Sequence, residues 1–237
     1  MAETQKIKIV VFDLGRTLME YKGMKLSWIS YYKNSFDYVN EKLSLGLSDR
    51  QIEESIAILT DYNPRIKPRE KEIAPETIFA DVTAKWNTDV PVKQIVDTFF
   101  ESLKLEPLFY DDSIPSLKVL RERGYKIAAL TDVATAMPDE LHKSYVAPLL
   151  PYFDLYVSSL SCGYKKPNPK GLNDIAAHFG AVPEAMIMVG DDLRDVEVAR
   201  RFGCASVLIE RTGEHRELGQ TYTISNLDGL LQILARQ

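Results

Sequence analysis

Residues 6–18 read KIKIVVFDLGRTL, and this stretch decides how the rest of the chain is interpreted. Its first seven residues are rich in β-branched and apolar side chains, which predicts a buried strand over residues 6–12. The strand ends at Asp13. Because ligands of parallel α/β sheets bind beyond the carboxyl ends of the strands, an acidic residue at this position is a candidate for chemistry.

The same strand pattern recurs in the C-terminal half, where apolar runs alternate with helical periodicity. Strands that alternate with helices and consist of continuous apolar runs predict a parallel sheet covered on both faces. The helices carry N-cap candidates at their starts and glycines at their ends. We expect strands over 125–130, 154–158, 186–189 and 205–209, and helices over 114–120, 172–179, 196–202 and 227–234.

Residues 20–106 depart from this pattern and are predicted to form a helical insert between the first strand and the rest of the sheet. Ser48 and Gln51 have the spacing of a capping box and predict a helix start. A second amphipathic helix is expected over residues 93–103, and a proline-broken basic stretch, residues 63–71, lies between the two. This division gives a core of residues 1–19 and 107–237 and an insert of residues 20–106.

Composition restricts the classes of function. The 237 residues include 29 Lys and Arg against 34 Asp and Glu, a net charge of -5, which disfavours a general nucleic-acid binder. No apolar run is long enough to span a membrane. Two distant cysteines, Cys162 and Cys204, form no disulfide framework and fit a reducing cytoplasm. The sequence does not indicate an oligomeric state.

Polar residues cluster at four places, each of which follows a predicted strand either directly or after a short loop. These are FDLGRTL (residues 12–18), LTD (130–132), GYKKPNP (163–169) and VGDDLRD (189–195). Taken singly, each could be a helix cap, a turn or a solvated loop. Their common position at strand ends is harder to explain by structure alone, and it predicts one shared site.

The residue types at these places suit chemistry on a phosphate. A strand-end aspartate such as Asp13 can act as a nucleophile, and carboxylates such as those of Asp13 and Asp191 can hold a hard divalent cation. The hydroxyl of Thr131 can donate to a phosphoryl oxygen, and the ammonium of Lys166 can neutralise developing charge.

The four stretches resemble, in order, the four motifs of the haloacid dehalogenase superfamily. The resemblance covers nearly the whole chain and implies a Rossmann-like, doubly wound parallel sheet, with the helical insert in the place of that family's cap. It further implies an Mg²⁺-dependent phosphatase of small phosphorylated metabolites, such as sugar phosphates.

Residue by residue, the resemblance implies that Asp13 is the nucleophile that forms an aspartyl-phosphate. Thr131, the backbone of Asp132 and Lys166 would bind the transferring phosphoryl group, with Lys165 as the alternative lysine. Mg²⁺ would be held by Asp13, the backbone carbonyl of Gly15, and Asp191, with Asp192 and Asp195 in support.

The chain departs from the usual first motif at one position. Where the family usually has a second aspartate that protonates the leaving group, this sequence has Gly15, followed by Arg16. General acid–base catalysis contributes about 10²–10⁴-fold, so its loss should slow the reaction without abolishing it. Arg16 could contact the substrate or point to solvent.

Other functions remain open. A haloacid dehalogenase would need no proton donor, because a halide leaves unprotonated, but the acidic pair Asp191 and Asp192 suits a metal that such a reaction does not need. The Gly15 substitution also allows a weak or inactive binding or regulatory protein. Cleavage of a C–P bond would need a Schiff-base lysine from the insert, for which Lys67 and Lys71 are the candidates.

The residues that select the substrate are expected in the helical insert. Tyr21, Lys22, Lys25 and Trp28 could line the mouth of the pocket, although Trp28 with Tyr31, Tyr32 and Phe36 also fits a helix packing face. The basic side chains of residues 65–69 could meet an anionic substrate or remain solvated.

Overall fold

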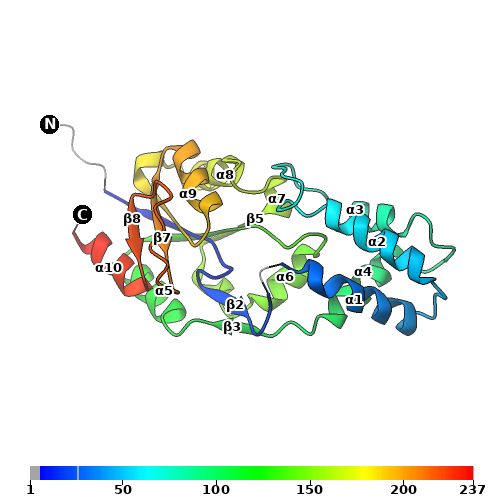
Figure 1. Cartoon of the computed structure of the whole chain (residues 1–237). Helices are drawn as coiled ribbons and strands as arrows, with labels where there is room; N and C mark the ends of the chain where they lie inside the picture. Colours follow the sequence, from blue (N-terminus) through cyan, green and yellow to red (C-terminus); the bar gives the residue numbers. More distant parts are fainter. Residues whose placement is uncertain (1–5, 26, 237) are drawn as a thin grey trace.

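The computed structural model describes residues 6–25 and 27–236 of the chain (Figure 1). Residues 1–5 and 237 of the predicted core, and residue 26 of the predicted insert, therefore lie outside the described residues. Within that part of the chain, no helix combines the length and the apolar character that a membrane crossing requires.

A parallel sheet of six strands forms the centre of the described core, in the order β5-β4-β1-β6-β7-β8. The prediction of a parallel α/β fold is confirmed. Its strands are β1 (Ile9–Phe12), β4 (Lys126–Thr131), β5 (Leu155–Ser158), β6 (Met186–Gly190), β7 (Ala205–Ile209) and β8 (Tyr222–Ile224).

Alternate residues of β1 pack into two different apolar clusters, one on each face of the sheet. Val10 and Phe12 contact the cluster that contains leucines of helices α5 and α10. Ile9 and Val11 contact the cluster that contains residues of α8 and α9. Burial on both faces explains why the strands have continuous apolar sequences. The covering helices are α5 (Ser113–Glu122), α8 (Lys170–Phe179), α9 (Leu193–Phe202) and α10 (Leu227–Ala235).

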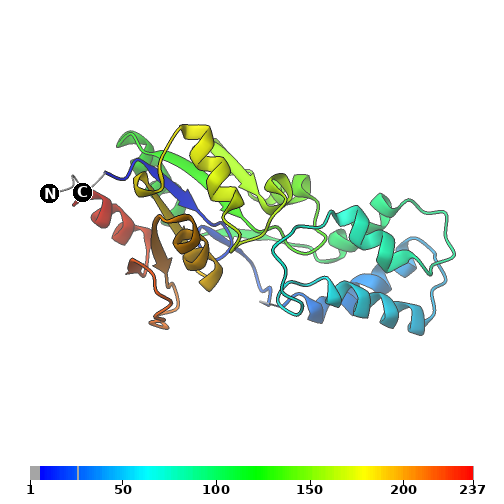
Figure 2. The ribbon, with the colours of Figure 1, turned by 90° about the horizontal axis from the view of Figure 1, so that it is seen from above.

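Four helices of the helical insert pack together beyond one end of the sheet (Figures 1 and 2). Their shared apolar cluster is centred on Phe36, Phe79 and Phe99. The predicted start at Ser48 is confirmed, since the capping box with Gln51 is present. The helices are α1 (Ile29–Lys42), α2 (Asp49–Asp61), α3 (Pro75–Thr83) and α4 (Val92–Ser102).

Several short elements of the structure were not predicted from the sequence. The strands β2 (Met19–Tyr21) and β3 (Pro107–Phe109) form an antiparallel ribbon where the chain enters and leaves the insert. Strand β8 and these two strands have three residues each, too few to show a period of two. The short helices α6 (Asp139–Tyr145) and α7 (Ser159–Cys162) follow β4 and β5.

Candidate active site

The topology brings three of the predicted strand-end sites together. Strand β1 lies between β4 and β6 in the sheet, and all three strands run in the same direction. Asp13 directly follows β1, Thr131 is the last residue of β4, and Asp191 directly follows β6. These residues are buried, and together they line one cavity.

Lys166 reaches this group from the loop after α7. Its ammonium lies 2.6 Å from Oδ1 of Asp13 and 2.5 Å from Oδ1 of Asp195. The backbone N–H of Lys166 donates to Oδ1 of Asp132 at 3.0 Å. This hydrogen bond holds the loop beside the end of β4. Burial alone would lower the pKa of Lys166, but the carboxylates of Asp13 and Asp195 raise it above its usual value. Lys166 is therefore the charged partner of Asp13.

Lys165, the alternative to Lys166 in the sequence, points elsewhere. Its ammonium donates to the carbonyl of Val133 at 2.8 Å and lies 2.6 Å from Oε2 of Glu72. The geometry thus separates the two adjacent lysines, with Lys166 at the strand ends and Lys165 directed towards the helical insert.

Three buried carboxylates form the acidic part of the site. Oxygen atoms of Asp13, Asp191 and Asp195 lie within 4.8 Å of one another. Burial and the neighbouring carboxylate of Asp195 raise the pKa of Asp191 to about 6, although Arg16 opposes the shift. Burial likewise raises the pKa of Asp13 above its ordinary value. The cluster therefore carries an unfavourable concentration of negative charge.

Asp192 is placed differently from its neighbour Asp191. It is the N-cap of α9, where its carboxylate accepts from the backbone N–H and the Nε of Arg194, both at 3.1 Å. Arg65 of the helical insert lies 3.3 Å from its second oxygen. Burial alone would raise the pKa of Asp192, but Arg194 and Arg65 hold this pKa well below its usual range. The third carboxylate of the buried cluster is that of Asp195, which reaches it from the first turn of α9.

The loop after β1 has an unusual backbone at Arg16. Its φ of 60° lies in the left-handed region, which costs a non-glycine residue of order 1–3 kcal/mol. Its guanidinium lies 3.1 Å from Oδ2 of Asp191. Gly15 has an ordinary φ, and a Cβ added there would meet nothing within 4 Å. Thr17 is buried, and its hydroxyl donates to Oδ2 of Asp13 at 3.5 Å.

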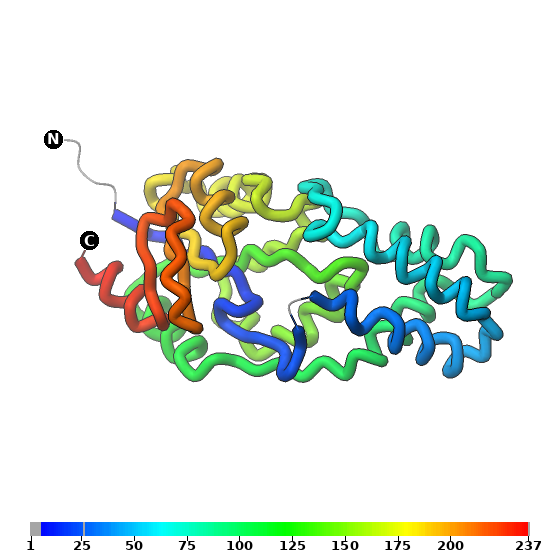
Figure 3. The backbone as a smooth tube through the Cα atoms, viewed as in Figure 1, coloured from blue at the N-terminus to red at the C-terminus, as the bar shows by residue number. Residues whose placement is uncertain are grey.

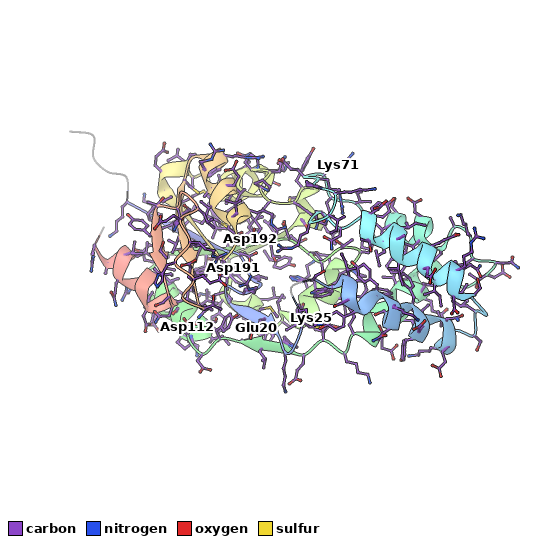
Figure 4. The ribbon with its side chains drawn as sticks, viewed as in Figure 1. Glu20, Lys25, Lys71, Asp112, Asp191 and Asp192 are labelled. Carbon is purple, nitrogen blue, oxygen red and sulfur yellow. The ribbon has the colours of Figure 1, made fainter. Side chains whose placement is uncertain are left out.

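A cavity of about 440 Å³ lies between the strand ends and the helical insert. Figure 4 shows Asp191 and Asp192 on the sheet side and Lys25 on the insert side. The residues named from the sequence that line it are Asp13, Gly15, Arg16, Thr131, Asp132, Lys165, Lys166, Asp191, Asp192 and Asp195, together with Tyr21, Lys25, Trp28, Tyr32 and Arg65 of the helical insert.

Phe36, which the sequence suggested for a helix packing face, belongs to the apolar cluster of the helical insert. Two lysines that the sequence suggested for contact with the substrate do not line the cavity. Lys22 pairs with Glu106, and Lys67 pairs with Asp61, both at the surface.

Arg194 lines the cavity but was not singled out from the sequence. Its guanidinium lies 3.3 Å from Oδ2 of Asp132. Burial alone would lower the pKa of Arg194, but the carboxylates of Asp132 and Asp192 raise it above its usual value. The signal for this arrangement was available, because Asp192 and Asp195 have the spacing of an N-cap and N3 pair, which predicts the start of α9 and places Arg194 in its first turn.

The comparison with protein families identifies the class of this fold and site. The model of the family described as haloacid dehalogenase-like hydrolase matches residues 7–203. The chain therefore belongs to this family of hydrolases, which confirms the resemblance stated above.

Individual relatives extend this finding. The chain is 30% identical over 215 residues to a protein of Methanopyrus kandleri named glyceraldehyde 3-phosphate phosphatase, an alignment that covers 90% of this chain and 87% of that protein. It is 27% identical to a phosphoglycolate phosphatase of Vibrio vulnificus strain YJ016, over 85% of this chain and 83% of that one.

Solved structures show the same fold. A HAD phosphatase from Thermococcus onnurineus matches with a TM-score of 0.64 and 24% identity, over 96% of this chain and 98% of that one. A 2-haloacid dehalogenase from Pseudomonas syringae pv. Tomato DC3000 matches with a TM-score of 0.72 and 20% identity, over 97% and 99%. At these identities the matches establish the fold alone.

Proposed function

We propose that the chain is an Mg²⁺-dependent phosphatase of small phosphorylated metabolites that acts through an aspartyl-phosphate on Asp13. The observation that carries this proposal is the buried group at the strand ends, in which Asp13 faces the ammonium of Lys166 and the carboxylates of Asp191 and Asp195. The relatives named as phosphatases of glyceraldehyde 3-phosphate and phosphoglycolate support the choice of substrate class.

The residues present fit a divalent cation. Three carboxylates face two contacting cations, Lys166 and Arg16, which leaves a formal charge of minus one (three against two) before any phosphate enters. Mg²⁺ prefers carboxylate and carbonyl oxygens. We propose that Asp13, Asp191 and the carbonyl of Gly15 hold it, and that Asp192 supports it with its nearby negative charge. When bound, the ion would neutralise the phosphate oxygens and polarise the phosphorus centre.

The chain's own residues would carry out the transfer in two steps. The phosphoryl group would lie against the hydroxyl of Thr131, the backbone N–H of Asp132 and the ammonium of Lys166. A carboxylate oxygen of Asp13 attacks phosphorus, the ester P–O bond breaks, and the leaving oxygen takes a proton from water. Water then attacks the same phosphorus, the bond to Asp13 breaks, and inorganic phosphate leaves, while the proton lost by this water neutralises the hydroxide left by the first step.

The substrate beyond the phosphate would contact the helical insert. We propose that residues 20–106 act as a cap over a core of residues 1–19 and 107–237. The cavity of about 440 Å³ is lined on the insert side by Trp28, Tyr32 and Arg65, and Arg16 lines it beside Asp191. We assign Arg16 to the substrate, because its guanidinium reaches this cavity from a strained backbone. The two free cysteines fit a cytoplasmic enzyme.

Phosphate release tests this proposal. A panel of phosphorylated metabolites is incubated with the wild-type chain and with Asp13→Asn, each with and without Mg²⁺. We expect Mg²⁺-dependent release by the wild type and background release by a folded Asp13→Asn variant. Full activity in that variant would remove the aspartyl-phosphate mechanism.

The same preparation distinguishes the alternatives. Halide release from a 2-haloacid, with no phosphate release from any ester, would favour a dehalogenase. Absence of both activities would favour a binding or regulatory protein.

A further inference from the structure

A second buried ion pair lies beside Lys166 and is not used in the proposed mechanism. The ammonium of Lys165 and Oε2 of Glu72 are 2.6 Å apart, and their side chains are 3% and 6% exposed. Glu72 comes from the helical insert, from the segment between α2 and α3, whereas Lys165 belongs to the loop that carries Lys166. The pair therefore joins the insert to the catalytic loop in the protein interior.

The backbone around Glu72 is hydrogen-bonded to the same loop. The N–H of Glu72 donates to the carbonyl of Gly163 at 2.9 Å, and the N–H of Lys165 donates to the carbonyl of Glu70 at 2.7 Å. Lys71 and Tyr164 lie opposite each other between these two hydrogen bonds and form an antiparallel bridge. Residues 70–72 are therefore held against residues 163–165 through their backbones. Figure 3 shows the chain between α2 and α3 running against this loop, and Figure 4 labels Lys71 within it.

The carboxylate of Glu72 is also linked, through Ser159 of α7 and through Lys165, to the loop that follows β4. The hydroxyl of Ser159 donates to Oε2 of Glu72 at 2.5 Å and accepts from the N–H of Val133 at 3.0 Å. The ammonium of Lys165 donates to the carbonyl of Val133 at 2.8 Å. One oxygen of Glu72 thus holds two donors, and each of them fixes one side of the Val133 backbone.

These contacts adjoin the residues that are proposed to bind the phosphate. Val133 directly follows Thr131 and Asp132, and Asp132 accepts the backbone N–H of Lys166. A displacement of the Glu72 carboxylate would release both Lys165 and Ser159. The strand-end loop and the lysine loop would then lose a shared anchor.

We propose that Glu72 is a positioning residue, which acts through Lys165 and Ser159 to hold Lys166 and the backbone of residues 131–133 in place for phosphoryl transfer. This inference rests on the proposed function. A misplacement of about 1 Å at a reacting group can cost roughly 100-fold in rate. Because Glu72 belongs to the helical insert, docking of that insert onto the core completes the site, in addition to enclosing the substrate.

A purely structural role is the competing explanation, and it makes a different prediction. Replacing a buried ion pair by apolar side chains of similar volume is often neutral or stabilising, whereas removing one partner is strongly destabilising. The double variant Glu72→Leu/Lys165→Met should therefore recover the melting temperature lost in Glu72→Gln. If Glu72 serves only stability, catalysis should recover together with the melting temperature.

The test measures Tm, kcat and KM for the wild type, Glu72→Gln, Lys165→Met and the double variant. We expect Glu72→Gln to lower kcat about tenfold to 100-fold while KM changes much less, and the double variant to keep this low kcat at a restored Tm. A double variant that regains both Tm and kcat, or wild-type kcat in Glu72→Gln, would overturn the inference. Asp37→Asn, which removes the exposed pair of Lys33 and Asp37 on α1, is the matched control with unchanged kcat.

Ser159→Ala keeps the test decisive if the charge variants do not fold. It removes only the hydroxyl that joins Glu72 to Val133. We expect a several-fold loss of kcat with little change in Tm, and wild-type kcat in this variant would contradict the proposal.

Failure of the proposed function is recognised separately, because the wild type would then release no phosphate. In that case crystal structures of the wild type and of Ser159→Ala still test the positioning. An unchanged placement of Val133 and of the Lys166 ammonium relative to Asp13 would overturn it, and a displacement of both would support it.

Discussion

At Gly15 the sequence lacks the second aspartate that the resemblance to the family implies for the first motif. In the proposed mechanism, the leaving oxygen would therefore take its proton from water. The rate should therefore depend strongly on the basicity of the leaving group. Phenolic and hemiacetal phosphates should react faster than simple alkyl phosphates, since general acid catalysis matters least for weakly basic leaving groups.

The variant Gly15→Asp tests this account directly. The added Cβ meets nothing within 4 Å and the backbone φ at Gly15 is not left-handed, so the side chain can be accommodated. We expect kcat for alkyl phosphates to rise, by up to about 10²–10⁴-fold, with a smaller gain for p-nitrophenyl phosphate. Steady-state kinetics on both substrates measure this difference. Gly15→Ala is the control, and an equal response of the two variants would show that proton donation is not limiting.

His142 provides a prediction about stability rather than catalysis. It is 7% exposed, its Nδ1 lies 2.8 Å from the hydroxyl of Tyr156, and burial lowers its pKa to about 4. The ordinary pKa is about 6.5, so between these values the unfolded chain binds the proton more readily than the folded one. The stabilising contribution is complete above about pH 6.5 and is lost as the pH falls towards 4, by roughly 3 kcal/mol in total.

Urea unfolding measured across this pH range checks the His142 prediction. The free energy of unfolding should fall more steeply with decreasing pH in the wild type than in His142→Gln. The exposed His178→Gln on α8 is the matched control. Parallel pH profiles for the wild type and His142→Gln would contradict the assignment.

At the scale of the elements, caps fix helices of both parts of the molecule. The side chain of Ser48 accepts from the backbone N–H of Gln51, and the side-chain oxygen of Gln51 accepts from the backbone N–H of Ser48. We expect Ser48→Ala to lower the free energy of unfolding by about 1 kcal/mol, while Ser48→Asp, which keeps an acceptor, stays near the wild type. Denaturant unfolding measures both, and equal losses would show that the cap hydrogen bond is not the cause.

Elements with long apolar patterns could be predicted from the sequence, and short ones could not. Strands β1, β4 and β6 are buried on both faces, so their apolar runs are continuous and their ends mark Asp13, Thr131 and Asp191. Parallel strand ends meet at one edge, which is why a local pattern predicted a nonlocal site. Strands β2, β3 and β8 are too short to show such a pattern.

Contacts between distant segments were beyond the sequence for a different reason. No local feature of residues 63–74 indicates that Glu72 pairs with Lys165, because the pairing depends on how the helical insert docks. The same holds for the contact of Arg65 with Asp192. The left-handed backbone of Arg16 was also hidden, since such a conformation is typical of glycine and asparagine.

At the scale of the whole molecule, the sheet presents a charged site at its strand ends, and the helical insert lines the other side of the same cavity. The excess negative charge of Asp13, Asp191 and Asp195 predicts that Mg²⁺ stabilises the folded chain. An ion present at about 100 times its dissociation constant adds about 2.7 kcal/mol, which corresponds to a rise of several degrees in Tm.

Thermal unfolding with and without Mg²⁺ measures this effect without any assay of activity. Asp191→Asn should lose the Mg²⁺-dependent rise, whereas Asp174→Asn, at an exposed pair on α8, should retain it. An unchanged rise in Asp191→Asn would place the cation elsewhere.

If Asp13 accepts the phosphoryl group, the aspartyl-phosphate can be trapped during turnover. The wild type and Asp13→Asn are mixed with Mg²⁺ and p-nitrophenyl phosphate labelled in the phosphoryl group, quenched in acid within a single turnover, and digested for mass spectrometry. We expect a phosphorylated peptide that contains Asp13 in the wild type and none in the variant. Turnover by the wild type with no labelled peptide, or with the label on another residue, would contradict it.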